Sequence, residues 1–220
     1  MSPRGRAGPT TVTTDLWPLV HAERTALADD LAACSDADWR TPSLCTAWTV
    51  EETVAHLVAG ASIGPLRWFR SVLGARGSFD RHNARRLAEY RGATPVETLS
   101  RFRAVVGSTT CPPGPVEMWL GEIVVHGGDV RRPLGLVRDV PVSTLTPLAT
   151  FFAKQNSTVR SRSLAEGLRL EATDGPFAAG PDDGPRVSGP TLALVMAMAG
   201  RAAFCDDLTG PGVAVLRSRC

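Results

Sequence analysis

One stretch, residues 116–132, limits the possible folds more than any other part of the chain. Within it Glu122, His126 and Asp129 stand at positions i, i+4 and i+7, which an α-helix brings to one face. Apolar residues fill positions 123–125, so this polar face is embedded in apolar surface. Two carboxylates and an imidazole in such a place need a partner, because burying them unpaired is costly. A divalent metal is the obvious candidate, and a further protein ligand should come from elsewhere in the chain.

The chain before this stretch carries further helix signals. Apolar residues recur at helical spacing, and Thr49 and Thr94 each begin a capping box that ends in a glutamate three positions later. Loops of modest length separate the segments, as expected of a bundle with four main helices. The expected helices are residues 15–33, 49–60, 66–73, 79–90, 94–106 and 116–132.

After about residue 140 the pattern changes. Residues 167–173 alternate between polar and apolar like a strand, and the turn signal Asp174-Gly175 follows them. This alternation indicates a small α+β unit in place of further bundle helices. Its other expected elements are helical segments at 143–163, 192–200 and 202–208 and short strands at 177–179, 186–188 and 212–216.

The whole chain is therefore predicted to be α+β, with a disordered lead-in over 1–14, a helix bundle over 15–140 and a small α+β domain over 141–220. The net charge is only +2 and no run of basic residues stands out, so nucleic acid is not an expected partner. The longest strongly apolar run, 192–199, is too short to span a bilayer, so no membrane partner is expected. The five cysteines are odd in number and include no CxxC pair, which favours a reducing, cytoplasmic location.

His56 is the one imidazole on the apolar face of the helix that begins at Thr49. Taken alone, it fits a packed core histidine better than a ligand. With Glu122 and His126 it completes a set of two imidazoles and one carboxylate, which zinc accepts in open catalytic sites. Iron, nickel or manganese could use the same donors. Asp129 lies one turn beyond His126 and is expected to orient a ligand.

Arg85 and Arg86 are the candidate cofactor-binding residues, although a solvated helix face fits them equally well. The sequence contains no nucleophile elbow, phosphate-binding loop, dinucleotide fingerprint or HExxH motif. No glutamate stands beside a ligand histidine as a general base. An open metal without a strong base suggests that the metal binds and activates an incoming group. A thiol is a good candidate, because coordination deprotonates it.

Two segments resemble motifs of the mycothiol-dependent maleylpyruvate isomerase-like family, which belongs to the DinB-like four-helix metalloproteins. The first, TPSLCTAWTVEETVAHL at 41–57, is similar to the family's opening TPCxGWTVxDVxxHL. The second, EIVVHGGDVRRPLG at 122–135, is similar to ExxxHGxDxxxxxG. The tail, 192–210, resembles the family's C-terminal domain, which has a sterol-carrier-like α+β shape. The sequence departs from the first motif at Ala47 and at Glu51-Glu52, near the entrance of the implied site.

This resemblance implies a divalent metal, most often zinc, on His56, Glu122 and His126, and mycothiol bound as its thiolate. In the founding activity of the family the thiolate adds to a conjugated double bond, the bond rotates, and the thiol leaves. Relatives instead transfer the thiol to an electrophile. Arg201 matches a Gly-Arg pair of the C-terminal domain, which implies that it reaches an anionic group in the cleft between the domains. Asp129 and Arg201 are therefore the candidate catalytic residues.

The expected function is a metal- and mycothiol-dependent enzyme in which a metal-bound thiolate attacks a small electrophile, anionic or neutral. The reaction would be cis–trans isomerisation or thiol S-transfer. Two alternatives stay open: a metal-dependent hydrolase, which would need Asp129 or Glu52 as its base, and a regulatory protein that binds the metal without turnover. The expected partners are the electrophile and a low-molecular-weight thiol, and the expected assembly is a monomer or a homodimer.

Overall fold

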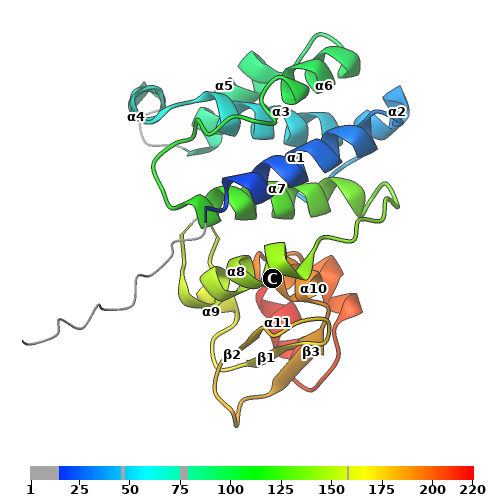
Figure 1. Ribbon diagram of the computed structural model, residues 1–220, viewed down its shortest axis with the longest axis vertical. Helices are drawn as coiled ribbons and strands as arrows, with labels where there is room; N and C mark the ends of the chain where they lie inside the picture. The colour runs from blue at the N-terminus through cyan, green and yellow to red at the C-terminus, as the bar shows by residue number, and fades with distance from the viewer. Residues whose placement is uncertain (1–14, 46–47, 75–78, 158) are drawn as a thin grey trace, which may run out of the picture.

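The computed structural model describes residues 15–45, 48–74, 79–157 and 159–220. The lead-in predicted for 1–14 lies outside these ranges. Helices make up most of the described chain, and a small three-stranded sheet lies at one end of the molecule (Figure 1). The α+β class expected from the sequence is confirmed. Within the described ranges, no helix has both the length and the apolar character that crossing a lipid bilayer requires.

Four helices surround the core of the bundle. Each contacts two of the others: α1 packs on α6 and α7, and α3 packs on the same two. Their fully buried side chains include Leu27, Phe102, Leu120 and Ile123. Three further helices complete this part of the chain, and α5 packs against the outside of α3. The bounds are α1 Trp17–Leu31, α2 Asp36–Trp39, α3 Val50–Ser62, α4 Pro65–Gly74, α5 Phe79–Tyr90, α6 Pro95–Arg103 and α7 Val116–Arg131.

The capping signals set where two bundle helices begin. At the start of α3 the Thr49 hydroxyl accepts from the Glu52 amide at 3.3 Å, and the Glu52 carboxylate accepts from the Thr49 amide at 2.9 Å, so the predicted capping box is confirmed. At the start of α6 Thr94 accepts from the Glu97 amide at 3.2 Å. There the carboxylate of Glu97 bonds the amide of Ala93 at 2.8 Å, one residue earlier than a capping box requires.

The sheet is covered by helices that lie between it and the bundle (Figure 1). Strand β1 (Arg169–Ala172) is central: it runs antiparallel to β2 (Ala178–Ala179) and parallel to β3 (Arg186–Gly189). Helix α10 touches both β1 and β3 as well as α7. It is apolar on all sides because it is enclosed on all sides. The remaining elements are α8 Val142–Lys154, α9 Ser161–Leu164, α10 Thr191–Met198, the 3₁₀ helix η1 Ala202–Asp207 and α11 Val213–Arg219.

Glycines on α7 allow the C-terminal helices to approach it closely. A Cβ at Gly128 would lie 2.6 Å from Met196 Cε of α10, and a Cβ at Gly121 would lie 3.0 Å from Phe152 Cζ of α8. Larger residues at these two positions would push α8 and α10 away from the bundle. Helix α7 consequently lies between the other bundle helices and the C-terminal helices. One continuous apolar core includes residues from both parts.

Two expectations for the C-terminal part were wrong. The helix expected over 143–163 is interrupted after Lys154 and resumes only as the single turn of α9. The strand expected over 212–216 is instead the helix α11. The place beside β3 is already taken by Thr209, which exchanges two backbone hydrogen bonds of 2.8 Å with Ser188. The chain then turns away at Gly210, whose φ is +109°, so the short apolar alternation after it finds no strand partner.

Candidate metal centre

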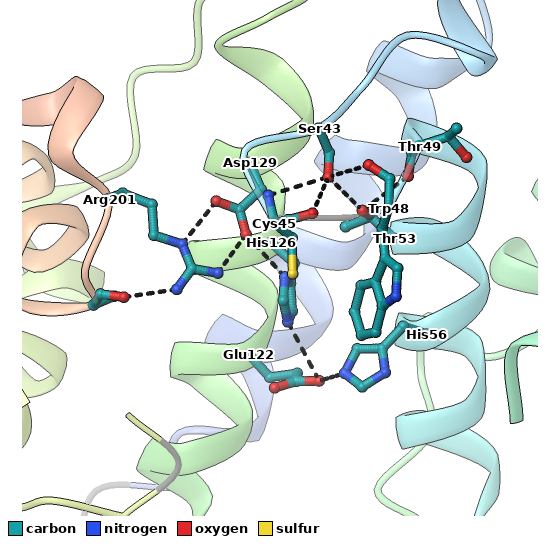
Figure 2. Close-up of polar contacts among 11 residues, drawn as sticks. Ser43, Cys45, Trp48, Thr49, Thr53, His56, Glu122, His126, Asp129 and Arg201 are labelled. Atoms are coloured by element: carbon teal, nitrogen blue, oxygen red, sulfur yellow. Dashed lines mark hydrogen bonds and ion pairs between the residues drawn. The ribbon is translucent and has the colours of Figure 1, made fainter. Parts of the chain in front are cut away.

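Three donor groups predicted from the sequence meet on the facing sides of α3 and α7. The Nε2 atom of His56 lies 2.7 Å from Glu122 Oε1, and the same oxygen lies 3.8 Å from His126 Nε2 (Figure 2). One ligand atom from each residue lies within 4.8 Å of the other two. Helical spacing places Glu122 and His126 on one face of α7, and the packing of α3 against α7 brings in His56.

A folded loop before α3 places an aromatic ring over the site. Ser43 Oγ donates to the Trp48 carbonyl at 2.9 Å and accepts from Thr53 Oγ1 at 2.9 Å, so the loop is bonded to the first turn of α3. The Trp48 ring consequently lies against His56, with 4.8 Å between the ring centroids (Figure 2). This contact limits how far the imidazole can rotate. The sequence comparison included Trp48 in a motif but gave it no role.

Asp129 selects the tautomer of the second imidazole. Its Oδ2 lies 3.0 Å from His126 Nδ1, and because a carboxylate can only accept, the Nδ1 nitrogen carries the proton. In the neutral ring the Nε2 nitrogen, which points toward Glu122 and His56, therefore holds the free lone pair. A carboxylate that orients a histidine in this way is a common support for a metal ligand. Asp129 therefore contacts His126, and its role in orienting a metal ligand stays a prediction.

Arg201 reaches Asp129 from the C-terminal part of the chain. Its Nε donates to Asp129 Oδ1 at 2.9 Å and its Nη2 donates to Oδ2 at 2.6 Å (Figure 2). Its Nη1 donates to the carbonyl of Ala199 at 2.6 Å. The resemblance implied that Arg201 contacts an anionic group in the cleft. The structure shows that its strongest contacts are with Asp129, although the side chain also lines the cavity beside the site.

The electrostatics of the site follow from these contacts. Burial alone would raise the pKa of Glu122, but the positive charges that His56 and His126 carry when protonated, together with the hydrogen bond from His56, outweigh it and bring that pKa to about 2. Burial would likewise raise the pKa of Asp129, and the hydrogen bonds from Arg201 and His126 more than offset it, so that pKa is lowered. Both carboxylates are therefore ionised at neutral pH.

A second set of possible metal ligands shares His126 with the first. The ligand atoms of Cys45, His126 and Asp129 also lie within 4.8 Å of one another. However, both oxygens of Asp129 already accept hydrogen bonds from Arg201. Burial, followed by the charge of Asp129, raises the pKa of the Cys45 thiol to about 11, so this thiol is protonated. The set of His56, Glu122 and His126 fits a divalent cation better, because Glu122 is ionised, Nε2 of the neutral His126 ring holds a lone pair, and the proton that His56 Nε2 donates to Glu122 is displaced when a cation binds.

A cavity of about 660 Å³ adjoins the three donors. It is large enough for a small-molecule ligand. Arg86 of α5 lines this cavity, whereas Arg85 is exposed and donates to the Gly74 carbonyl at 2.9 Å. The structure thus separates the two arginines that the sequence treated alike. The walls come from α3, α4, α5, α7, α8 and neighbouring loops, and include Trp68, Met118, Trp119, Phe152 and Val159.

Trp119 is a cavity residue to which the sequence analysis gave no role. It precedes Glu122 by three positions on α7, so the two side chains lie on neighbouring parts of one helix face. This spacing was a signal that could have identified it. Its side chain is almost completely buried, and the residue is 8% exposed.

Comparisons with known proteins agree with the sequence motifs. Residues 20–111 match the family model described as the mycothiol maleylpyruvate isomerase N-terminal domain. A crystal structure of the mycothiol-dependent maleylpyruvate isomerase matches with a TM-score of 0.60 and 20% sequence identity, over 89% of this chain and 91% of that chain. A crystal structure of a mutant of that enzyme, with one histidine replaced by alanine, matches with a TM-score of 0.60 and 19% identity over the same shares. No curated protein matches the sequence. The structural likeness shows that the fold is shared along nearly the whole chain.

Proposed function

We propose that the chain, whose residues 20–111 match the model of the mycothiol maleylpyruvate isomerase N-terminal domain, is a metal- and thiol-dependent enzyme of that family that acts on a small electrophile. The reaction we favour is cis–trans isomerisation. In it a thiolate adds to one carbon of a conjugated double bond, rotation follows about the resulting single bond, and expulsion of the same thiolate restores the double bond. Transfer of the thiol to the electrophile is the closest variant of this chemistry. We take mycothiol as the thiol and zinc as the first candidate for the metal.

The observation that carries this proposal is that three side chains able to ligate a metal, His56, Glu122 and His126, lie together at the wall of one cavity. His56 and His126 each present Nε2 to the Oε1 of Glu122. When bound there, a divalent cation would keep an incoming thiol ionised at neutral pH. The open side of the donor set faces the cavity of about 660 Å³, which leaves room for the thiol and the electrophile.

The remaining residues of the site support this arrangement. Asp129 keeps the proton of His126 on Nδ1, and Arg201 holds Asp129 in place through two hydrogen bonds. We therefore assign Asp129 and Arg201 a positioning role. Trp48 lies against the imidazole of His56 and reduces the access of water from that side.

The hydrolase alternative lacks a free base. Asp129 accepts hydrogen bonds from both Arg201 and His126. The carboxylate of Glu52 accepts from the amide and the hydroxyl of Thr49, at 2.9 and 3.0 Å, in the capping box. Neither carboxylate can be spared without losing a contact that positions the site. No observation favours the hydrolase over the thiol-dependent enzyme.

Metal content and turnover together test the proposal. We expect stoichiometric zinc in the wild-type protein and in the control variant His21→Ala, whose imidazole lies 3.3 Å from the Ser108 carbonyl and outside the donor set. We expect little zinc in His56→Ala and in His126→Ala. Isomerisation of maleylpyruvate should require both zinc and mycothiol. Stoichiometric zinc in both ligand variants, or turnover without any thiol, would contradict the proposal, and the second result would support a hydrolase.

A further inference from the structure

Two residues that line the same cavity each carry a buried hydrogen-bond donor without an acceptor. Among the described residues, three buried side-chain nitrogens have no hydrogen-bond partner: Arg86 Nε, Trp119 Nε1 and Arg131 Nη2. The first two belong to residues of the cavity that adjoins the metal donors. Native proteins rarely leave a buried donor unpaired, because such a group loses its bonds to water and gains none in return. Two such donors in one cavity indicate that a ligand supplies the acceptors.

The position of Trp119 puts its indole close to the metal donors. The residue is more than nine-tenths buried and lies one helical turn before Glu122 on α7. A side chain at Gly60 on the facing helix would come within 4.0 Å of the Trp119 ring and 3.9 Å of Glu122 Oε1. The ring therefore fills the space between α3 and α7 beside the predicted ligand set. An acceptor bound to its N–H would belong to a molecule that also lies near the metal.

The surroundings of Arg86 fix its guanidinium and leave it with excess positive charge. Its Nη1 lies 2.6 Å from Glu89 Oε2, and Glu89 also pairs with Arg67. One carboxylate thus serves two guanidinium groups, so the three side chains together carry a charge of +1. The contact through Nη1 orients the group and leaves the Nε edge unbonded. A guanidinium edge of this kind suits a carboxylate oxygen.

We propose that Trp119 Nε1–H and Arg86 Nε–H are specificity-determining donors that bind a carboxylate of the electrophile. The inference rests on the proposed function, since it takes the cavity to be the site of that reaction. It assigns Arg86 to the electrophile and not to the thiol. The neutral indole N–H comes from α7, one turn before Glu122, and the cationic group comes from α5. Together they orient a carboxylate-bearing molecule with its other end toward the position of the thiol.

Calorimetric titration with maleate, a small dicarboxylate, tests the inference without turnover. The variants are Trp119→Phe, which keeps an aromatic ring at this position and removes the indole N–H, and Arg86→Gln. We expect each to weaken maleate binding by about tenfold or more, the effect of losing a hydrogen bond to a charged group. The control Arg103→Gln, an exposed arginine of α6 outside the cavity, should bind maleate like the wild type. Maleamide, which carries two neutral amides, should bind all proteins equally weakly.

The design separates this inference from the proposed function. The titrations are run with zinc-loaded protein and with protein stripped by a chelator, and the losses in Trp119→Phe and Arg86→Gln should appear in both forms. Unchanged maleate affinity in both variants overturns the inference, as does absence of binding to the wild type. It is also overturned if the variants raise only the mycothiol concentration needed for saturation, because the donors then serve the thiol. Failure of zinc or thiol dependence in turnover would refute the proposed function and leave the maleate result standing.

Discussion

Replacing Asp129 with Asn perturbs the most enclosed carboxylate of the site. The residue is 0% exposed, and its two oxygens accept from His126 Nδ1, Arg201 Nε and Arg201 Nη2. Asparagine has nearly the same shape but offers only one oxygen, and its NH₂ group would face a donor. The guanidinium of Arg201 would then lie buried without a counter-charge. Breaking a buried pair by removing one partner costs about 3–5 kcal/mol, and we expect Asp129→Asn to lose stability within that range.

The same variant should weaken the metal site without touching a predicted ligand. Loss of a carboxylate that orients a ligand histidine lowers metal affinity by roughly 10–100-fold. Urea unfolding of the metal-free protein at neutral pH measures the first effect, and zinc competition against a chelator measures the second. The double variant Asp129→Asn/Arg201→Met is the matched control, because it also removes the unpaired charge. It should recover part of the stability lost in Asp129→Asn.

Two outcomes would refute this reasoning. A stability loss below about 1 kcal/mol in Asp129→Asn would mean that the buried pair contributes no more than a surface ion pair. A double variant less stable than the single one would mean that the unpaired guanidinium is not the source of the cost. Unchanged zinc affinity would separately refute the role of Asp129 in orienting His126.

Three further predictions follow from local geometry. Thr49→Ala should destabilise the protein by about 1 kcal/mol in urea unfolding, because it removes the N-cap of α3; no change would show that the cap is dispensable. Gly180→Ala should cost about 2 kcal/mol or more, since φ is +91° and a Cβ would lie 1.9 Å from the Leu168 carbonyl oxygen, whereas Gly107→Ala meets nothing and should be close to neutral in the same assay. Burial, and after it the charge of Asp129, raises the pKa of Cys45 to about 11. Alkylation of this thiol, followed by mass spectrometry, should therefore be slow at neutral pH and should accelerate up to about pH 11. A rate that levels off near pH 8 to 9, at the ordinary thiol pKa of about 8.5, would contradict the effect of burial.

The sequence was sufficient to predict that Glu122 and His126 share a helix face and that His56 lies on another helix, because helical spacing and capping depend only on nearby residues. Helical spacing alone puts Glu122 and His126 on one face, and the capping box at Thr49 fixes where the helix that carries His56 begins. The contact between the two helices then brings the three groups together. Their role as metal ligands stays a prediction.

The orientation of Arg201 could not be obtained in this way. Its partner Asp129 lies 72 positions earlier in the chain, and the contact exists only because α10 packs against α7. The sequence likewise could not separate Arg85 from Arg86. Consecutive residues on a helix point about 100° apart, so only one of the two can face the cavity, and the packing of α5 on α3 decides which. The prediction of a strand at 212–216 was wrong for a similar reason. Thr209 occupies the edge of β3 in the folded chain, and the local sequence does not reveal this contact.

The bond between Arg201 and Asp129 links two properties that are usually measured separately. The arginine belongs to the C-terminal half, and the carboxylate supports a histidine of the bundle. If packing of the C-terminal part strengthens metal binding through this bond, metal binding must strengthen the packing of the C-terminal part by the same free energy. This follows because coupling between two sites is reciprocal. A cation bound inside the bundle would therefore stabilise the contact between the bundle and the C-terminal part. Withdrawing it should loosen residues 142–220 before the bundle itself unfolds.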